Sequence, residues 1–263
     1  MSVAAAAMWD PDHYLRFADH RTRPGVELLA RIPDVADARR VVDLGAGTGH
    51  LTARLARRWP EAEVTGVDGD PAMAARARAE HPELAWVTAD LAAWEPEGPV
   101  DVLYSNAALH WLDRHETLFP RLRSWLAPGG VLAVQMPDNW AAPTHRIPAE
   151  VLDEAGGRWP DAAGPALMRD RLSAPEAYAG WLSPAASLDL WRTTYYQRLT
   201  GDDPVWQWTT GSLLIPVLEA LGPDRDRFAA EVQGRYRQAY PPDPSGVVTL
   251  PFSRLFLVAQ APS

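Results

Sequence analysis

The sequence predicts an α/β protein built on a mostly parallel sheet that helices cover on both faces. Between residues 41 and 136, short apolar segments alternate with amphipathic helical segments. A loop with three glycines follows the first apolar segment, and acidic residues end the next two. Strands that are apolar throughout are typical of a parallel sheet buried on both faces, and strand–helix alternation is typical of its crossover connections.

Each element of this part of the chain can be placed by its pattern. Before the sheet, residues 9–31 are expected to be helical, because Asp10 can cap a helix and Pro11 suits its first position. Apolar runs predict strands, and the 3.6-residue period between them predicts helices. The expected strands are 41–44, 63–68, 84–90, 100–106 and 130–136, and the expected helices are about 49–58, 71–80, 107–111 and 115–126.

The regular alternation of strands and helices ends after Met136. Residues 137–187 are rich in Pro, Gly and Ala, and two further strands are expected at 187–199 and 249–260. Between these strands, one helical stretch begins at Asp203-Pro204 and reaches about Leu221, and another covers about 224–239. We expect a single domain over 1–263. Its N-terminal cap (about 9–31) and helical insertion (about 200–245) are expected to form a lid over the carboxyl edge of the sheet.

Composition excludes several classes of function. The chain has 263 residues, a net charge of −9 and 47% hydrophobic residues, which is enough for one large core. An acidic chain has no general attraction for nucleic acid or for anionic membranes. There is no Cys, so disulfides and thiolate metal sites are excluded. No signal peptide or membrane span is recognisable. We expect a cytoplasmic protein with no metal and no obligate protein partner.

The segment VVDLGAGTGHLT (41–52) is the first candidate binding element. In open parallel sheets, ligands bind beyond the carboxyl ends of the strands, and Gly45, Gly47 and Gly49 let the backbone approach a ligand closely. The dinucleotide fingerprint G-x-G-x-x-G requires a third glycine at position 50, where this chain has His50. The loop alone leaves two cofactors open, a nicotinamide or flavin dinucleotide and S-adenosylmethionine.

Two acidic residues at later strand ends narrow the choice. Asp68 lies 19 residues after Gly49 and can accept hydrogen bonds from both ribose hydroxyls of an adenosine, which suits either cofactor. The alternative for Asp68 is a turn role at the strand end. Asp90 can accept from the adenine amino group, with the Leu91 amide near the ring, and this favours S-adenosylmethionine. The alternative for Asp90 is a helix N-cap.

The motifs together resemble the class I S-adenosylmethionine-dependent methyltransferases. The similar segments are VDLGAGTGHL, GVDGD, ADL, SNAALHWL and APGGVLAV. The resemblance implies a Rossmann-like, mostly parallel seven-stranded sheet with a reversed C-terminal hairpin, for which the two late strands are the candidates. It also implies S-adenosylmethionine as cofactor and S-adenosylhomocysteine as product.

A narrower resemblance covers nearly the whole chain and is weakest at 150–185. The segments MWDPDHYLRFADHRTRPGVELLARI, NAALHWL, AVQMPDNWAAPTH, LWRTTYYQRL and PFSRLFLVA resemble the trans-aconitate 2-methyltransferase family. The loop reads GAGTG where such enzymes often carry Cys and Pro. The resemblance implies esterification of one carboxylate of trans-aconitate, so the expected partner is a small polycarboxylate.

This resemblance assigns the candidate site residues to the cofactor or to the substrate. No catalytic acid or base is expected, because a carboxylate is already ionised at neutral pH, although His110 can serve as an orienting donor. The cofactor candidates are Tyr14, Arg23, Asp43, Gly45, Ala46, Gly47, Asp68, Gly69, Asp90, Leu91 and Asn106. The substrate candidates are His110, Trp111, Gln135, Asn139, Arg192, Tyr195, Tyr196 and Arg254. Three alternatives stay open: a methyltransferase for another small acid or hydroxyl, a nicotinamide oxidoreductase, and a non-catalytic binding module.

Overall fold

The computed structural model describes residues 18–154, 159, 172–211 and 213–263. The chain divides into two compact units, which are described separately below. The sheet unit comprises 21–137, 172–193 and 254–263, and the helical unit comprises the described residues among 1–20, 138–171 and 194–253. The strands β6 (Ser187–Leu199) and β7 (Val248–Gln260) contribute residues to both units.

A seven-stranded sheet carries the candidate binding loops. Its order is β3-β2-β1-β4-β5-β7-β6. Strand β1 pairs in parallel with β2 and β4, and β7 pairs antiparallel with β5, which confirms the predicted reversal. The first five strands are β1 (Arg40–Leu44), β2 (Glu63–Asp68), β3 (Ala85–Thr88), β4 (Val100–Asn106) and β5 (Leu126–Pro137).

Most element boundaries agree with the sequence, and the differences have local causes. Strand β5 begins before the predicted residue 130, because Leu126 already pairs with Val100 across a bulge in the β4–β5 ladder. The predicted helix from Asp203 to Leu221 is two helices, α9 (Pro204–Thr210) and α10 (Ile215–Leu221). The N-terminal helix α2 is described over Ala18–Arg31, so the predicted residues 9–17 lie outside the described part.

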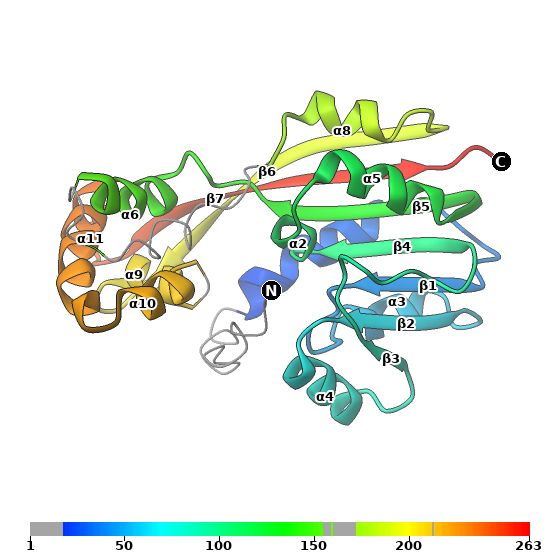
Figure 1. Ribbon diagram of the computed structural model, residues 1–263, viewed down its shortest axis with the longest axis horizontal. Helices are drawn as coiled ribbons and strands as arrows, with labels where there is room; N and C mark the ends of the chain where they lie inside the picture. The colour runs from blue at the N-terminus through cyan, green and yellow to red at the C-terminus, as the bar shows by residue number, and fades with distance from the viewer. Residues whose placement is uncertain (1–17, 155–158, 160–171, 212) are drawn as a thin grey trace. The chain divides into compact units, whose positions relative to one another are not determined.

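Helices cover both faces of the sheet (Figure 1). On one face, α5 (His115–Ser124) and α8 (Pro175–Trp181) bury apolar side chains against Leu103, Leu132 and Val134. On the opposite face lie α2 and α3 (Thr52–Arg58), where the Tyr104 hydroxyl donates to a carbonyl oxygen of α2 at 2.8 Å. The remaining helical elements of this unit are α4 (Pro71–Glu80) and the short η1 (Leu109–Trp111).

The helical unit has a hydrophobic core of its own. Its elements are α6 (Pro143–Glu154), α9, α10, η2 (Gly222–Asp224) and α11 (Arg225–Ala239). Buried aromatic and aliphatic side chains from these helices meet around Trp208 and Phe228. The Trp159 indole donates to the Val151 carbonyl at 3.0 Å, which links this tryptophan to α6.

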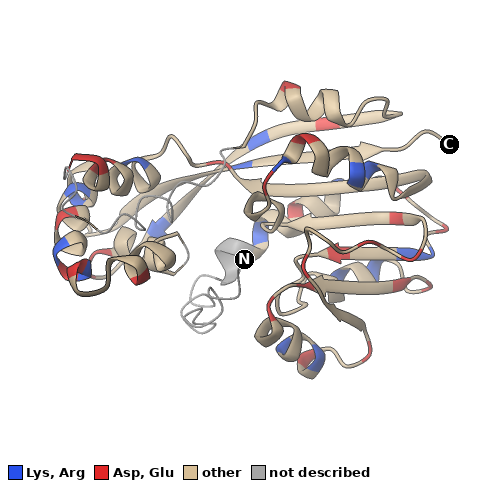
Figure 2. Cartoon of the chain, in the orientation of Figure 1, with Lys and Arg blue, Asp and Glu red and all other residues tan. Residues whose placement is uncertain are grey.

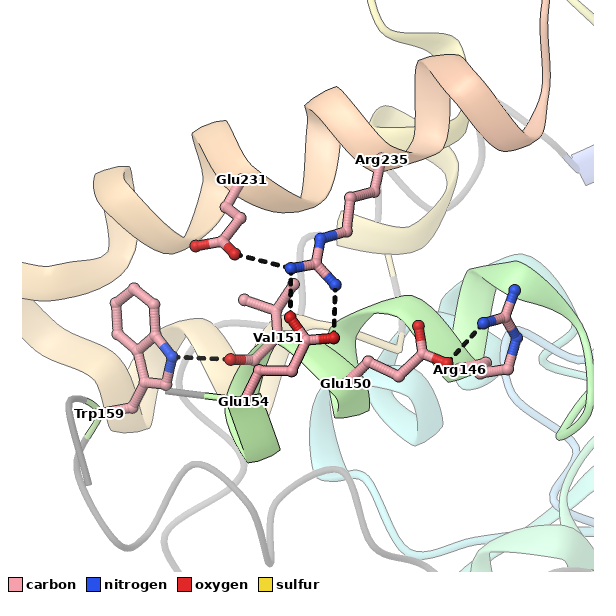
Figure 3. A network of polar contacts seen from close by, with 7 residues as sticks. All are labelled: Arg146, Glu150, Val151, Glu154, Trp159, Glu231 and Arg235. Atoms are coloured by element: carbon pink, nitrogen blue, oxygen red, sulfur yellow. Dashed lines mark hydrogen bonds and ion pairs between the residues drawn. The ribbon is translucent and has the colours of Figure 1, made fainter. Parts of the chain in front are cut away.

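An ion pair joins α6 to α11 at the surface of this unit (Figure 3). Arg235 of α11 donates to both oxygens of Glu154 and to Glu231, at 3.1, 2.6 and 2.9 Å. Acidic and basic side chains are interleaved along α11 (Figure 2). Exposed pairs contribute little each, so the apolar core carries most of the stability of this unit. The expectation that residues 200–245 form a lid stays a prediction.

No helix in the described part of the chain is long and apolar enough to cross a bilayer.

Candidate active site

The three loop glycines face three different surroundings. All have positive φ, at +78° for Gly45, +57° for Gly47 and +84° for Gly49. A Cβ on Gly45 would lie 2.1 Å from the Ala108 Cβ, and one on Gly49 would lie 2.3 Å from the Trp86 ring. Among the described residues, no atom lies within 4 Å of a Cβ built on Gly47. Of the three glycines, therefore, Gly47 is the one that borders open space in the described part of the chain.

Gly47→Ala and Gly49→Ala should separate cofactor binding from folding. A left-handed alanine costs about 1 kcal/mol of stability, and at residue 47 its methyl group also enters the open space. We expect Gly47→Ala to fold and to bind S-adenosylhomocysteine at least about 10-fold more weakly, a loss of about 1.4 kcal/mol. Gly49→Ala should unfold readily, because its methyl group meets Trp86. Calorimetric titration with thermal melting checks both, and an unchanged Kd in Gly47→Ala would contradict the assignment.

Asp68 holds the glycine loop against the end of β2. Its Oδ2 accepts from the Gly47 amide at 2.7 Å, and its Oδ1 accepts from the Asp70 amide at 2.8 Å. Each carboxylate oxygen keeps a further acceptor site. Burial raises the pKa of Asp68, while the two amide hydrogen bonds oppose that shift. Asp68 is therefore placed to fix the loop and to accept from a ligand at the same time.

Asp43 is a buried carboxyl group directly behind the loop. Its Oδ2 accepts from the Thr52 hydroxyl at 2.6 Å, and the residue is 2% exposed. The pKa of Asp43 is raised to about 7. Burial is the main cause, the Thr52 hydrogen bond opposes it, and the charge of Asp68 adds to it. The carboxyl therefore changes charge near neutral pH.

Asp43→Asn should change how stability depends on pH. The folded pKa of about 7 lies above the ordinary 3.8, so the native protein holds this proton more tightly than the unfolded chain. The wild-type protein should lose stability as pH rises from about 4 to about 7, on the order of 4 kcal/mol at most. Asparagine removes this loss. Urea unfolding without cofactor should show a higher free energy of unfolding for the variant, relative to the wild type, at pH 8 than at pH 4. A difference that is constant with pH would refute the shift.

Helix α2 lies directly on the loop and on the end of β4. His50 Nε2 lies 3.2 Å from the Thr22 hydroxyl. A Cβ on Gly25 would lie 2.5 Å from Leu51 and 2.9 Å from the Tyr104 hydroxyl, so α2 needs a glycine at this contact. Burial lowers the pKa of His50. In the sequence, His50 argued only against a dinucleotide, and no pattern predicted its contact with α2.

The end of β4 offers a buried acceptor. Asn106 Oδ1 is buried and, within the described ranges, has no hydrogen-bond partner. Asn106 pairs in register with Gln135 of β5, so the two side chains lie on the same face of the sheet. The next residue, Ala107, has a left-handed backbone with φ +55°, and it leads into η1 with His110 and Trp111. Strained backbone of this kind clusters at functional sites.

A buried cation lies beside this strand end. Arg254 of β7 is 4% exposed, and its Nη1 lies 3.4 Å from Gln135 Oε1. Gln135 Nε2 is also buried, and no acceptor reaches it from the part of the chain that the structure describes. Burying a guanidinium is costly unless anionic or polar groups compensate it. Arg254 and Gln135 therefore form a donor-rich, desolvated position on the face that carries Asn106.

The other sheet-unit candidates are less buried. Asp90 is exposed, and its Oδ1 accepts from the Ala92 amide at 2.9 Å, which closes a turn next to Leu91. Arg23 is exposed and pairs with Glu27 at 2.7 Å. Arg192 is exposed on the opposite face of β6 from Trp191, whose ring stacks on Phe256 at 4.9 Å. These candidates lie outside the buried part of the site, and their roles stay predictions.

Three substrate candidates belong to the helical unit. Asn139 is buried and its Oδ1 accepts from the Ser253 amide at 2.6 Å. Tyr195 is buried, whereas Tyr196 is 67% exposed. Tyr14 lies outside the described residues. The structure thus groups Asp43, the glycine loop, Asp68, Asn106, His110, Gln135 and Arg254 within the sheet unit.

The fold and the loop define the class of protein. A family model described as a methyltransferase domain matches residues 41–130. The fold resembles the YcgJ protein of Bacillus subtilis, with a TM-score of 0.57 and 14% identity over 92% of this chain and 99% of that one. It also resembles phosphoethanolamine N-methyltransferase 2 of Haemonchus contortus in complex with S-adenosylhomocysteine, with a TM-score of 0.53 and 16% identity over 92% of this chain and 53% of that one.

Sequence similarity identifies the family within that class. The chain is 46% identical over 256 residues to trans-aconitate 2-methyltransferase of Methylobacterium nodulans, covering 97% of this chain and 98% of that protein. It is 43% identical over 254 residues to the enzyme of the same name from Escherichia coli O17:K52:H18, covering 96% and 98%. The chain belongs to the trans-aconitate 2-methyltransferase family. Its cofactor is S-adenosylmethionine, and the dinucleotide interpretation of the loop is set aside.

Proposed function

We propose that this protein transfers the methyl group of S-adenosylmethionine to one carboxylate of trans-aconitate. Family membership supports the reaction and the substrate class. The observation that carries the proposal is the buried Arg254–Gln135 pair, since a desolvated guanidinium is suited to a carboxylate of the acid.

The reaction needs little chemistry from side chains. S-adenosylmethionine supplies an electrophilic methyl group, to which a carboxylate oxygen bonds while the carbon–sulfur bond breaks, giving a methyl ester and neutral S-adenosylhomocysteine. The carboxylate is ionised at neutral pH, so no general base is required. Because opposite charges cancel as the transition state forms, a site with little water should favour the reaction.

The protein contributes binding and alignment. Gly47 and Asp68 make room for the cofactor and fix the loop, and Asn106 Oδ1 is suited to accept from its ammonium group. Arg254 and Gln135 hold a carboxylate that is not methylated, while His110 and Trp111 orient the acid from the end of β4. Fixing the two reactants in line can supply about 7–11 kcal/mol of the barrier reduction.

The proposal is tested with purified protein, S-adenosylmethionine and a panel of small acids. Mass spectrometry should detect a monomethyl ester with trans-aconitate, at a higher kcat/KM than with its cis isomer, with saturated tricarboxylates or with hydroxyl-bearing acids. Formation of S-adenosylhomocysteine without ester would contradict carboxyl transfer. If another acid in the panel is a much better substrate, carboxyl methylation is still supported but trans-aconitate is not the substrate.

A further inference from the structure

We propose that His115 is a positioning residue that fixes the turn carrying His110 and Trp111, and so controls acid binding without touching the acid. This inference rests on the proposed function, in which that turn contacts the substrate. All the residues involved belong to the sheet unit.

His115 joins two elements through both ring nitrogens. It is the first residue of α5 and is 9% exposed. Its Nε2 lies 3.0 Å from the Leu109 carbonyl oxygen, and its Nδ1 lies 2.7 Å from the Tyr178 hydroxyl. Because a carbonyl can only accept, Nε2 carries a proton; in the neutral ring, Nδ1 then accepts from Tyr178. The imidazole thus connects η1 directly to α8.

The turn held by His115 has an unfavourable backbone at both ends. Ala107 before it and Arg114 after it have φ values of +55° and +57°, which non-glycine residues rarely adopt. Such conformations persist only where surrounding contacts impose them. Here the contacts are the buried Leu109 side chain and the hydrogen bond from His115 to the Leu109 carbonyl, which also accepts from the Leu112 amide at 3.0 Å.

A rigid aromatic group supports the imidazole from the other side. Tyr178 is fully buried, with its ring centroid 4.8 Å from that of Phe119 and 5.1 Å from that of Trp181. Phe119 also packs against the His115 ring at 5.3 Å. Tyr178 therefore has little room to move, and its hydroxyl sets the orientation of the imidazole.

The turn also packs directly against the glycine loop. Ala108, the residue between the strained Ala107 and the anchored Leu109, packs so closely on Gly45 that a Cβ there would lie 2.1 Å away. A displaced turn would therefore move His110 and Trp111 relative to the loop that holds the cofactor. Small displacements of reacting groups lower the rate strongly.

Four variants of the full-length protein test the inference. His115→Leu should raise KM for trans-aconitate or lower kcat, with kcat/KM falling at least about 10-fold, while the Kd for S-adenosylhomocysteine stays within about twofold. His115→Gln should recover much of that loss, because its amide can donate to the Leu109 carbonyl. Tyr178→Phe should give a smaller loss. Phe119→Leu is the matched control, since it loosens the packing of the same cluster but removes none of the hydrogen-bonding groups.

The outcomes separate this inference from the proposed function. If Phe119→Leu, at an equal loss of Tm, reduces kcat/KM as much as His115→Leu, the role is structural and the inference fails. If His115→Leu does not fold, the comparison of Tyr178→Phe with Phe119→Leu decides in the same way. Separately, His110→Ala should raise KM for the acid; if it does not while the ester still forms, the substrate contact assigned to this turn is wrong. Absence of ester from the wild type would overturn the function itself.

Discussion

Asp68→Ala should lower the affinity for S-adenosylhomocysteine by about 100-fold or more, the largest effect expected at the cofactor site. The substitution removes an acceptor for a ligand and also the two hydrogen bonds that hold the amides of Gly47 and Asp70. A hydrogen bond to a charged group contributes about 1.5–3 kcal/mol, and 2.7 kcal/mol corresponds to about 100-fold in Kd. Isothermal titration calorimetry measures the change.

Asp70→Ala is the matched control for that experiment. Asp70 lies two residues away and accepts from the Ala72 and Met73 amides, so it caps α4. Its removal should cost about 1 kcal/mol of stability and leave the Kd for S-adenosylhomocysteine nearly unchanged. Equal losses of affinity in the two variants would mean that local stability, and not Asp68, controls binding.

Arg254→Met should raise KM for trans-aconitate by about 100-fold or more, with little change in the Kd for the cofactor product. Truncating one partner of a buried, hydrogen-bonded charge pair typically costs about 2–5 kcal/mol of binding, since the other charge is left without compensation. The methionine side chain keeps much of the buried volume, which limits the effect on folding. Steady-state kinetics with varied acid give KM, and calorimetry gives the Kd.

Gln135→Glu distinguishes a substrate-binding Arg254 from a purely structural one. Gln135 already lies 3.4 Å from the guanidinium, so a glutamate there would place a carboxylate directly beside it. We expect this variant to keep or raise its Tm and to lose affinity for the acid, because its own carboxylate occupies the cation. If Gln135→Glu binds trans-aconitate as well as the wild type does, Arg254 does not hold the substrate. Arg31→Met, which removes an exposed arginine of α2, is the control for the loss of positive charge.

The sheet could be predicted from the sequence because its signals are local. Apolar strands such as 63–68 and 100–106 are bounded by turn residues, and the structure places both strands at those limits. The predicted reversal of the last strand is present, as β7 pairs antiparallel with β5. The division of 204–221 into two helices was not predicted. In a sequence, a proline that begins a new helix looks the same as one that lies inside a longer helix.

The site was predictable only in part, because its remaining contacts join residues far apart in the chain. Asp43 and Asp68 stand at strand ends, where position alone marks them as candidates. Thr52, Tyr104 and His115 act through partners that no spacing reveals, such as the Leu109 carbonyl or the backbone of α2. Nor did the sequence distinguish Arg254 from Arg192; burial separates them in the structure.

The glycine at position 49 is required by its packing against Trp86, a residue distant in the chain, and not by a ligand. Trp86 fills the space beside Gly49, and also that beside Gly66, where a Cβ would lie 2.2 Å from its ring. The residues at 49 and 86 are therefore expected to change together over evolution, because a side chain at 49 would overlap the tryptophan ring. We expect relatives with alanine or serine at 49 to carry a smaller residue at 86. A designed Gly49→Ala protein should be rescued only in part by Trp86→Leu, because the φ of +84° at residue 49 still disfavours a side chain.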